Sequence, residues 1–299
     1  MSLNFAALSR WHAHSRSQRH DRNPASSLSP SAGTECKHGS GGMRETGCVG
    51  PEGRGDVPEY DIIGLGYDSK RRPDPRLGAA IREAIGQASN ILNVGAGAGS
   101  YEPSERPVVA LEPSSVMLAQ HPGHRRVRGT AEQLPFGDGT FDVALAILTV
   151  HHWKDLNAGL AELRRVARRQ VLFTWDPDHQ RKLWITTDYV PAIDDLETGR
   201  FTSLKSIVDA LGAHTVEPFE IPYDFTDGFQ AAFWRRPEIY LDPEVRAASS
   251  TFASLSPELV LPGIERLRRD LETGKWHEIY GELLDLEKMD FGHRIVIAG

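Results

Sequence analysis

Apolar positions in the central part of the chain occur in short continuous runs, and segments with helical spacing separate these runs. Short apolar runs are typical of strands buried on both faces of a parallel sheet, whereas a helical period of apolar positions indicates a helix with one buried face. The runs predict strands at residues 91–94, 108–112, 126–129, 141–150, 170–175, 215–222 and 294–298. The helical spacing predicts helices at residues 76–85, 114–121, 155–167 and 202–211. This alternation predicts an α/β fold with a doubly wound parallel sheet and right-handed crossovers.

The regular alternation breaks after residue 177, and residues 227–286 are predicted to be mostly helical. We expect this part to form a helical cap, inserted at about 227–288. Its aromatic residues begin with Phe229, Phe233, Trp234 and Tyr240. Helical spacing favours core positions for these side chains. A cap above a sheet also lines a pocket, so a substrate contact by one of them stays open.

The first 42 residues differ in composition from the rest of the chain. They are rich in Ser, His, Arg and Gly, and they hold few large aliphatic side chains. A segment that cannot bury a core is expected to be disordered. We therefore expect residues 1–42 to be a disordered extension, translation to start at Met43, and residues 43–299 to form the folded domain.

Composition narrows the classes of function. A net charge of −7 argues against a nucleic-acid binder, which would show a basic field. No apolar run approaches the roughly 18 residues of a membrane span. The two cysteines, Cys36 and Cys48, precede the predicted core, so neither a disulfide framework nor a cysteine metal site is expected. These features predict a cytoplasmic protein that binds neither nucleic acid nor a membrane and has no metal site.

A glycine-rich turn follows the first predicted strand. The run 93–99 reads Asn-Val-Gly-Ala-Gly-Ala-Gly, and the next strand ends in Glu112. Glycine permits positive φ and lets a ligand approach the backbone closely. A carboxylate at the end of the second strand can accept hydrogen bonds from both hydroxyls of a ribose. Together these features predict a nucleoside-binding crevice at the switch point of the sheet.

The residues after this turn indicate which nucleoside it binds. A dinucleotide site needs a helix directly after the glycines, because the helix N-terminus holds the pyrophosphate. Here Gly99 is followed by Ser-Tyr-Glu-Pro-Ser-Glu-Arg-Pro, in which Glu102 and Glu105 would oppose a pyrophosphate. S-adenosylmethionine has a ribose and an adenine but no phosphate. We therefore expect it, and not NAD, to be the cofactor.

Four motifs in order resemble the class I S-adenosylmethionine-dependent methyltransferases, in particular their type 11 small-molecule group. They are the glycine turn, Glu112-Pro-Ser, the run 129–136, and the stretch from Phe141-Asp142 to His151-His152-Trp153-x-Asp155. The resemblance covers about residues 60–299 and implies a seven-stranded sheet whose last strand is antiparallel.

The resemblance also implies roles for individual residues. It places Gly95, Gly97 and Gly99 against the methionine and ribose of the cofactor, Glu112 on the ribose hydroxyls, and Ala131 and Glu132 at the adenine edge. Leu148 is a further candidate for cofactor binding. Two positions depart from the family pattern. Asn93 replaces an acidic residue, so a carbonyl group could contact the ammonium, and Thr130 replaces an Asp before Ala131.

Three residues are candidates for catalysis. His151 and His152 follow the fourth strand, and an imidazole can take a proton from an acceptor near neutral pH. Successive residues leaving a strand point to opposite sides, so we expect one of the pair to face the pocket, with His151 favoured. Asp155 is predicted to be a helix N-cap.

The third candidate lies in Tyr67-x-x-x-Arg71-Arg72-Pro73, which is similar to the Arg-Pro segment of the trans-aconitate methyltransferase type. Arg72 could hold the cofactor carboxylate, and Tyr67 could close over the methyl group. A basic surface loop is the alternative.

The predicted activity is transfer of a methyl group from S-adenosylmethionine to O, N or C of a small, apolar or aromatic acceptor. The main alternative is a protein that binds S-adenosylmethionine without methyl transfer, as a regulator or as a cyclase of this fold. An NAD oxidoreductase is a weaker alternative. The acceptor and the oligomeric state are left open by the sequence.

Overall fold

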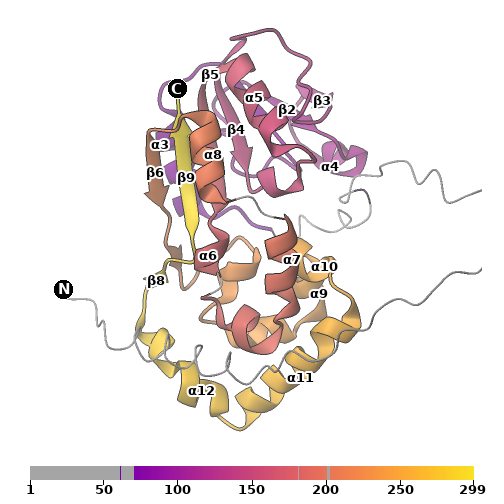
Figure 1. Cartoon of the computed structure of the whole chain (residues 1–299), viewed down its shortest axis with the longest axis vertical. Coiled ribbons are helices and arrows are strands. Elements are labelled where there is room, and N and C mark those ends of the chain that lie inside the picture. The colour runs from indigo at the N-terminus through magenta and orange to yellow at the C-terminus, as the bar shows by residue number, and fades with distance from the viewer. Residues whose placement is uncertain (1–60, 62–70, 181, 201–202) are drawn as a thin grey trace, which may run out of the picture. The chain divides into compact units, whose positions relative to one another are not determined.

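The computed structural model describes residues 61, 71–180, 182–200 and 203–299 (Figure 1). The predicted extension 1–42 and Tyr67 lie outside this range. The centre of the described part is a seven-stranded sheet with the order β3-β2-β1-β4-β5-β9-β6. Its strands are β1 (Ile91–Val94), β2 (Val108–Glu112), β3 (Arg126–Arg128), β4 (Phe141–Ile147), β5 (Ala167–Trp175), β6 (Thr215–Pro218) and β9 (His293–Ala298).

The strand directions confirm the predicted methyltransferase-type sheet. Strands β1 to β5 pair in parallel. Strand β9 lies between β5 and β6 and is antiparallel to both. Strand β1 pairs with β2 on one side and with β4 on the other, so the chain order reverses there. Ligands of open α/β sheets bind at such a switch point, outside the carboxyl ends of the strands.

Helices pack on the sheet where the apolar spacing predicts them. They are α3 (Pro75–Ile85), α4 (Ser115–Gln120), α5 (Leu156–Val166) and α8 (Leu204–Leu211). All four begin at an N-cap whose side chain accepts a backbone hydrogen bond: Asp74, Ser114, Asp155 and Ser203. The cap predicted at Asp155 is confirmed, because its Oδ1 accepts from the Ala158 amide at 3.0 Å. Helices α5 and α8 pack together over one core, which also contains Leu172 and Val296 of the sheet.

A second group of helices comes from two separate parts of the chain, and Figure 1 shows α7 and α9–α12 clustered below the sheet. One part contains α6 (Pro177–Gln180), the π-helical turn η3 (Ile185–Tyr189) and α7 (Ala192–Arg200). The other contains η4 (Gln230–Phe233), η5 (Pro237–Leu241), α9 (Pro243–Ala247), α10 (Ser250–Ala253), α11 (Pro257–Glu272), α12 (Lys275–Tyr280) and η6 (Gly281–Asp285).

Aromatic packing joins these two parts. The ring of Trp184 lies 5.3 Å from Tyr240, 5.4 Å from Trp276 and 5.8 Å from Tyr280, measured between centroids. Trp184 is 1 % exposed. The helical cap predicted at 227–288 therefore includes α6, η3 and α7 as well, because Trp184, directly before η3, supplies the centre of its core.

Two predicted strands are shorter in the structure. Strand β4 ends at Ile147, because Leu148 turns the chain with a φ of 50° and residues 150–152 form the 3-10 turn η2. The predicted strand 215–222 is split. Pro218 is the last residue paired with β9, and β7 (Ile221–Pro222) pairs with β8 (Lys288–Met289) in a separate two-stranded sheet. No helix in the described part of the chain has the length and apolar character needed to span a membrane.

Candidate functional site

The glycine turn at the end of β1 is packed too closely to accept side chains. Gly95, Gly97 and Gly99 have φ values of 70°, 54° and 88°. A β-carbon on Gly95 would lie 1.9 Å from Thr149 Oγ1, and one on Gly99 would lie 2.9 Å from His121 Nε2. Residues 95–107 contain turns and no helix, as predicted. The turn thus exposes backbone to a ligand without offering the helix N-terminus that a pyrophosphate requires.

Glu112 closes the crevice from the neighbouring strand. Its side chain accepts hydrogen bonds from the backbone amides of Gly97 and Ser114, both at 2.9 Å. The residue is 5 % exposed, and this burial raises the pKa of its carboxyl group. The carboxylate therefore lies at the glycine turn, where a ribose diol would meet it.

A buried polar network supports the other side of the turn. Glu102 Oε1 accepts from Asn93 Nδ2 at 2.9 Å and lies 3.1 Å from His121 Nε2. The proton of His121 is on Nε2, because its Nδ1 accepts from the Gly123 amide at 2.9 Å. Asn93 Oδ1 is buried without a hydrogen-bond partner among the described residues. The carboxylate of Glu102 therefore lies beside Asn93, the position at which the family pattern has an acidic residue.

These features fit S-adenosylmethionine. Asn93 Oδ1 is an acceptor available to an ammonium group, and Glu112 is an acceptor for ribose hydroxyls. The carboxylate of Glu102, beside the glycine turn, would oppose the pyrophosphate of a dinucleotide.

The structure gives less support to the two residues predicted to contact the adenine. Ala131 is buried. Glu132 Oε1 accepts from the amides of Lys154 at 2.8 Å and Asp155 at 3.4 Å. The structure therefore gives Glu132 a structural contact at the start of α5, and its adenine role stays a prediction.

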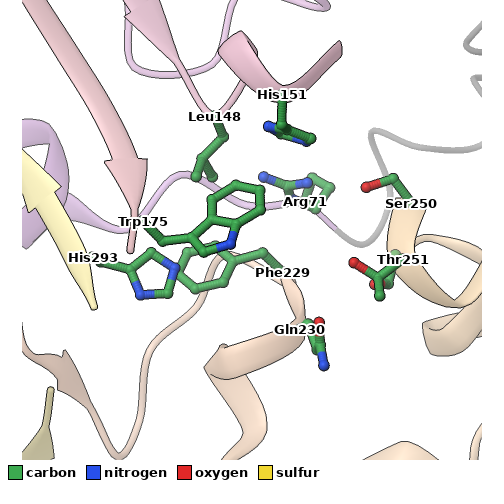
Figure 2. Close-up of a pocket in the computed structure, with 10 residues that line it drawn as sticks. Arg71, Leu148, His151, Trp175, Phe229, Gln230, Ser250, Thr251 and His293 are labelled. Carbon is green, nitrogen blue, oxygen red and sulfur yellow. The ribbon is translucent and has the colours of Figure 1, made fainter. Parts of the chain in front are cut away.

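A cavity lies where the ends of the strands meet the helical cap (Figure 2). Its lining combines rings, hydroxyl groups and one cation. The lining residues are Arg71, Leu148, His151, Trp175, Phe229, Gln230, Ser249, Ser250, Thr251 and His293. Trp175 ends β5, His293 begins β9, and Phe229 and Ser249 immediately precede η4 and α10. The cavity is thus built from the carboxyl edge of the sheet and from the cap.

The two candidate histidines lie on the turn η2 and differ in position. His151 lines the cavity, with its ring centroid 4.5 Å from that of Trp175. His152 is close enough to Glu112 to lower the pKa of that carboxyl group electrostatically, although burial outweighs this effect. The expectation that the pair points to opposite sides is wrong. Their ring centroids are 3.9 Å apart, because a 3-10 turn and not a strand carries them.

The arginine inside the cavity is Arg71, whereas Arg72 is exposed. Arg71 Nε and Nη2 form an ion pair with Asp227, whose side chain is 2 % exposed. Tyr101 Oη donates to Asp227 Oδ2 at 2.7 Å. Burial and Asp227 raise the pKa of Tyr101, which keeps its hydroxyl protonated as a donor. The predicted cofactor contact of Arg72 has no support from the position of its side chain.

Sequence reasoning missed several lining residues, although topology could have found two of them. Trp175 ends a parallel strand, and His293 starts an antiparallel strand, so both lie at the same edge of the sheet. Of the cap aromatics, Phe229 lines the cavity, whereas Trp234 and Tyr240 are buried in the core. No sequence signal separates Arg71 from Arg72.

Comparison with known proteins bears on this site. The family described as "Methyltransferase domain" matches residues 92–174. The structure of a protein described as a methyltransferase from an antibiotic biosynthesis pathway of Anabaena variabilis is similar to this chain. The two are 35 % identical with a TM-score of 0.71, and the match covers 77 % of this chain and 99 % of that one. The chain belongs to the S-adenosylmethionine-dependent methyltransferases.

Two curated proteins match shorter parts of this methyltransferase. The Bacillus subtilis protein "Uncharacterized methyltransferase YcgJ" is 32 % identical over 111 residues, which is 32 % of this chain and 44 % of that protein. The Escherichia coli "Uncharacterized protein YafE" is 37 % identical over 65 residues, which is 20 % of this chain and 31 % of that protein. These matches cover less than half of the curated relatives. The family assignment makes S-adenosylmethionine the cofactor of this methyltransferase.

Proposed function

We propose that this methyltransferase methylates O, N or C of a small aromatic or apolar molecule bound in the cavity of Figure 2. One relationship carries the proposal. Thr149 packs on Gly95 of the cofactor turn, while Leu148 and His151 on either side of it line the cavity. A single short segment therefore joins the predicted cofactor crevice to the predicted acceptor cavity.

The residues that would hold the cofactor are Gly95, Gly97, Gly99, Asn93 and Glu112. The bound cofactor supplies a methyl group on a sulfonium, which is both electrophile and leaving group. The protein must align the acceptor and exclude water. The acceptor atom, O, N or C, would supply the electron pair of the bond to the methyl carbon, and S-adenosylhomocysteine would leave with the electrons of the broken carbon–sulfur bond.

A protonated acceptor must also lose its proton. His151 is the proposed base, because it lines the cavity and lies two residues after Thr149, which packs on Gly95 of the glycine turn. An acceptor that is already ionised needs no base, and His151 would then act as part of the cavity wall.

The nature of the lining supports a small acceptor. The ring of Phe229 lies 4.8 Å from His293, and that of Trp175 lies 6.3 Å from His293. These rings form an apolar wall that suits a planar ligand.

The test is cofactor binding followed by an acceptor screen. Calorimetry should show binding of S-adenosylhomocysteine and no comparable binding of NADH. Small aromatic molecules should then release S-adenosylhomocysteine from S-adenosylmethionine in the presence of the protein, whereas tRNA and DNA should not. Equal or tighter binding of NADH would contradict the cofactor site, and release with nucleic acid alone would contradict the acceptor class.

A further inference from the structure

The cavity has a charge pattern that a purely apolar acceptor would not use. Arg71 is the one formal cation of the lining, and none of the described lining residues is acidic. Asp227, the partner of Arg71, lies behind it with its side chain 2 % exposed, compared with 12 % for Arg71. The ion pair thus turns its positive end toward the cavity.

Arg71 is also fixed in direction. Asp227 engages Nε and Nη2, and Tyr101 Oη and the Asp74 amide extend the network, with the amide 3.1 Å from the hydroxyl. The backbones of Arg71 and Asp227 form a β-bridge as well. A guanidinium carries five N–H groups in a rigid fork, and Asp227 engages the edge formed by Nε and Nη2. Such a preorganised guanidinium suits a carboxylate.

The remaining polar groups favour the same ligand. Ser249, Ser250 and Thr251 bring hydroxyl groups to the cavity, and the Ser249 side chain makes no capping hydrogen bond to α10. In the view of Figure 2, Ser250 and Thr251 lie on one side and Trp175, Phe229 and His293 on the other, with Arg71 between them. One side offers donors to oxygen atoms, and the other offers a flat wall to a ring.

His293 completes the wall as a neutral group. It is 2 % exposed, and its Nδ1 is buried without a hydrogen-bond partner among the described residues. Burial lowers the pKa of His293 to about 3, so its imidazole adds no charge near neutral pH. The cation that a ligand meets is therefore Arg71.

We propose that the cavity binds its acceptor as a small planar carboxylate, with the carboxylate on Arg71 and the ring plane against Trp175 and Phe229. This inference rests on the proposed function and names the acceptor class for it. Arg71 is then the residue that determines specificity, and Asp227 is a positioning residue.

The experiment compares three ligands with the same ring, using the full chain saturated with S-adenosylhomocysteine. Calorimetry with benzoate, benzamide and benzylamine should show benzoate binding at least about tenfold more tightly than benzamide, because an ionised pair is stronger than a neutral one. Benzylamine, which is cationic, should bind most weakly. Binding of benzamide as tight as that of benzoate, or no binding of benzoate, would overturn the proposal.

Variants assign the preference to Arg71. Arg71→Gln should abolish the difference between benzoate and benzamide, and the adjacent exposed Arg72→Gln should leave it unchanged. If Arg71→Gln does not fold, the pair Arg71→Gln/Asp227→Asn removes both buried charges and serves the same test. Retention of the benzoate preference in Arg71→Gln, or in the double variant Arg71→Gln/Asp227→Asn, would contradict the assignment.

The affinity for S-adenosylhomocysteine distinguishes a failure of the carboxylate inference from a failure of the proposed function. Unchanged cofactor affinity in Arg71→Gln is expected. A large loss of that affinity would show that Arg71 holds the cofactor carboxylate, which would overturn this inference and leave methyl transfer intact. Failure of the wild-type protein to bind S-adenosylhomocysteine would instead count against the proposed function itself.

Discussion

Thr149 fills the space that a side chain on Gly95 would need, with its Oγ1 1.9 Å from the place of the missing β-carbon. The contact joins the turn after β1 to the turn after β4, which are the two chain segments on either side of the switch point. The shape of the cofactor crevice therefore depends on close packing between these two turns as well as on the backbone of the glycine residues.

Gly95→Ala should destabilise the protein and weaken S-adenosylhomocysteine binding by more than tenfold. The alanine would be strained at a φ of 70° and would also displace Thr149. Gly139→Ala is the matched control, because Gly139 has a φ of 60° with no atom within 4 Å of the added carbon. Gly139→Ala should lower the free energy of unfolding, measured in urea, by about 1–2 kcal/mol, because it introduces backbone strain alone. Equal effects of the two variants would contradict the packing argument.

Glu112→Gln should weaken binding of S-adenosylhomocysteine by about 1–3 kcal/mol, because two ribose hydroxyls would lose a charged acceptor. The amide keeps the size of the side chain and preserves the strand. Glu105→Gln changes an exposed carboxylate after the same glycine turn and should leave the affinity unchanged. Titration calorimetry of both variants makes the comparison, and an unaffected Glu112→Gln would remove this residue from the ribose site.

Asp227→Asn should lower the free energy of unfolding by up to about 3–5 kcal/mol, because the largely buried guanidinium of Arg71 would lose its ion pair with Asp227. The double variant Arg71→Gln/Asp227→Asn should recover part of this loss. The exposed pair of Arg76 with Asp224, 2.7 Å apart, provides the comparison. Asp224→Asn should lower the free energy of unfolding by no more than about 1 kcal/mol. If urea unfolding gives similar losses of unfolding free energy for Asp224→Asn and Asp227→Asn, burial does not increase the contribution of the Arg71–Asp227 pair to stability.

His293 should make the protein less stable in mild acid. The folded state lowers the pKa of this histidine from 6.5 to about 3, so the unfolded chain binds the extra proton between these values. The neutral imidazole contributes its full stabilisation above pH 6.5. This stabilisation is lost as the pH falls toward 3, by up to about 1.4 kcal/mol per pH unit.

His293→Gln should therefore flatten the pH dependence of the unfolding free energy between about pH 6.5 and pH 4 relative to the wild type. His214→Gln, at an exposed histidine, should not change it. Urea unfolding across this range makes the measurement. An unchanged slope in His293→Gln would show that this imidazole is not held neutral by the fold.

The sheet could be predicted from the sequence because each buried strand carries its own apolar run and each flanking helix its own period. Ile91–Val94 and Leu156–Val166 are examples in which the local pattern and the structure agree. The cap was predicted only in part. Its core is built around Trp184, which lies far in sequence from Tyr240 and Trp276, and no local pattern records that contact.

The candidate site also has one part that the sequence predicts and one part that only the folded chain reveals. The glycine turn and Glu112 belong to one motif, so their proximity follows from the order of the strands. Arg71 enters the cavity because a bridge to Asp227, 156 residues away, fixes the direction of its side chain. The neighbouring Arg72 has the same chemistry and is exposed, and only the folded chain distinguishes the two.

The position of β9 bears on how the chain reaches its folded state. This strand comes later in the sequence than both of its partners, β5 on one side and β6 on the other. Until the ribosome has released residues 293–298, β5 presents an open apolar edge and β6 has no partner in the sheet. Long-range pairing of this kind is slow, and unpaired edges favour aggregation. The nascent chain therefore needs residues 293–298 before its seven-stranded sheet is complete, and we expect truncations within β9 to accumulate as insoluble protein.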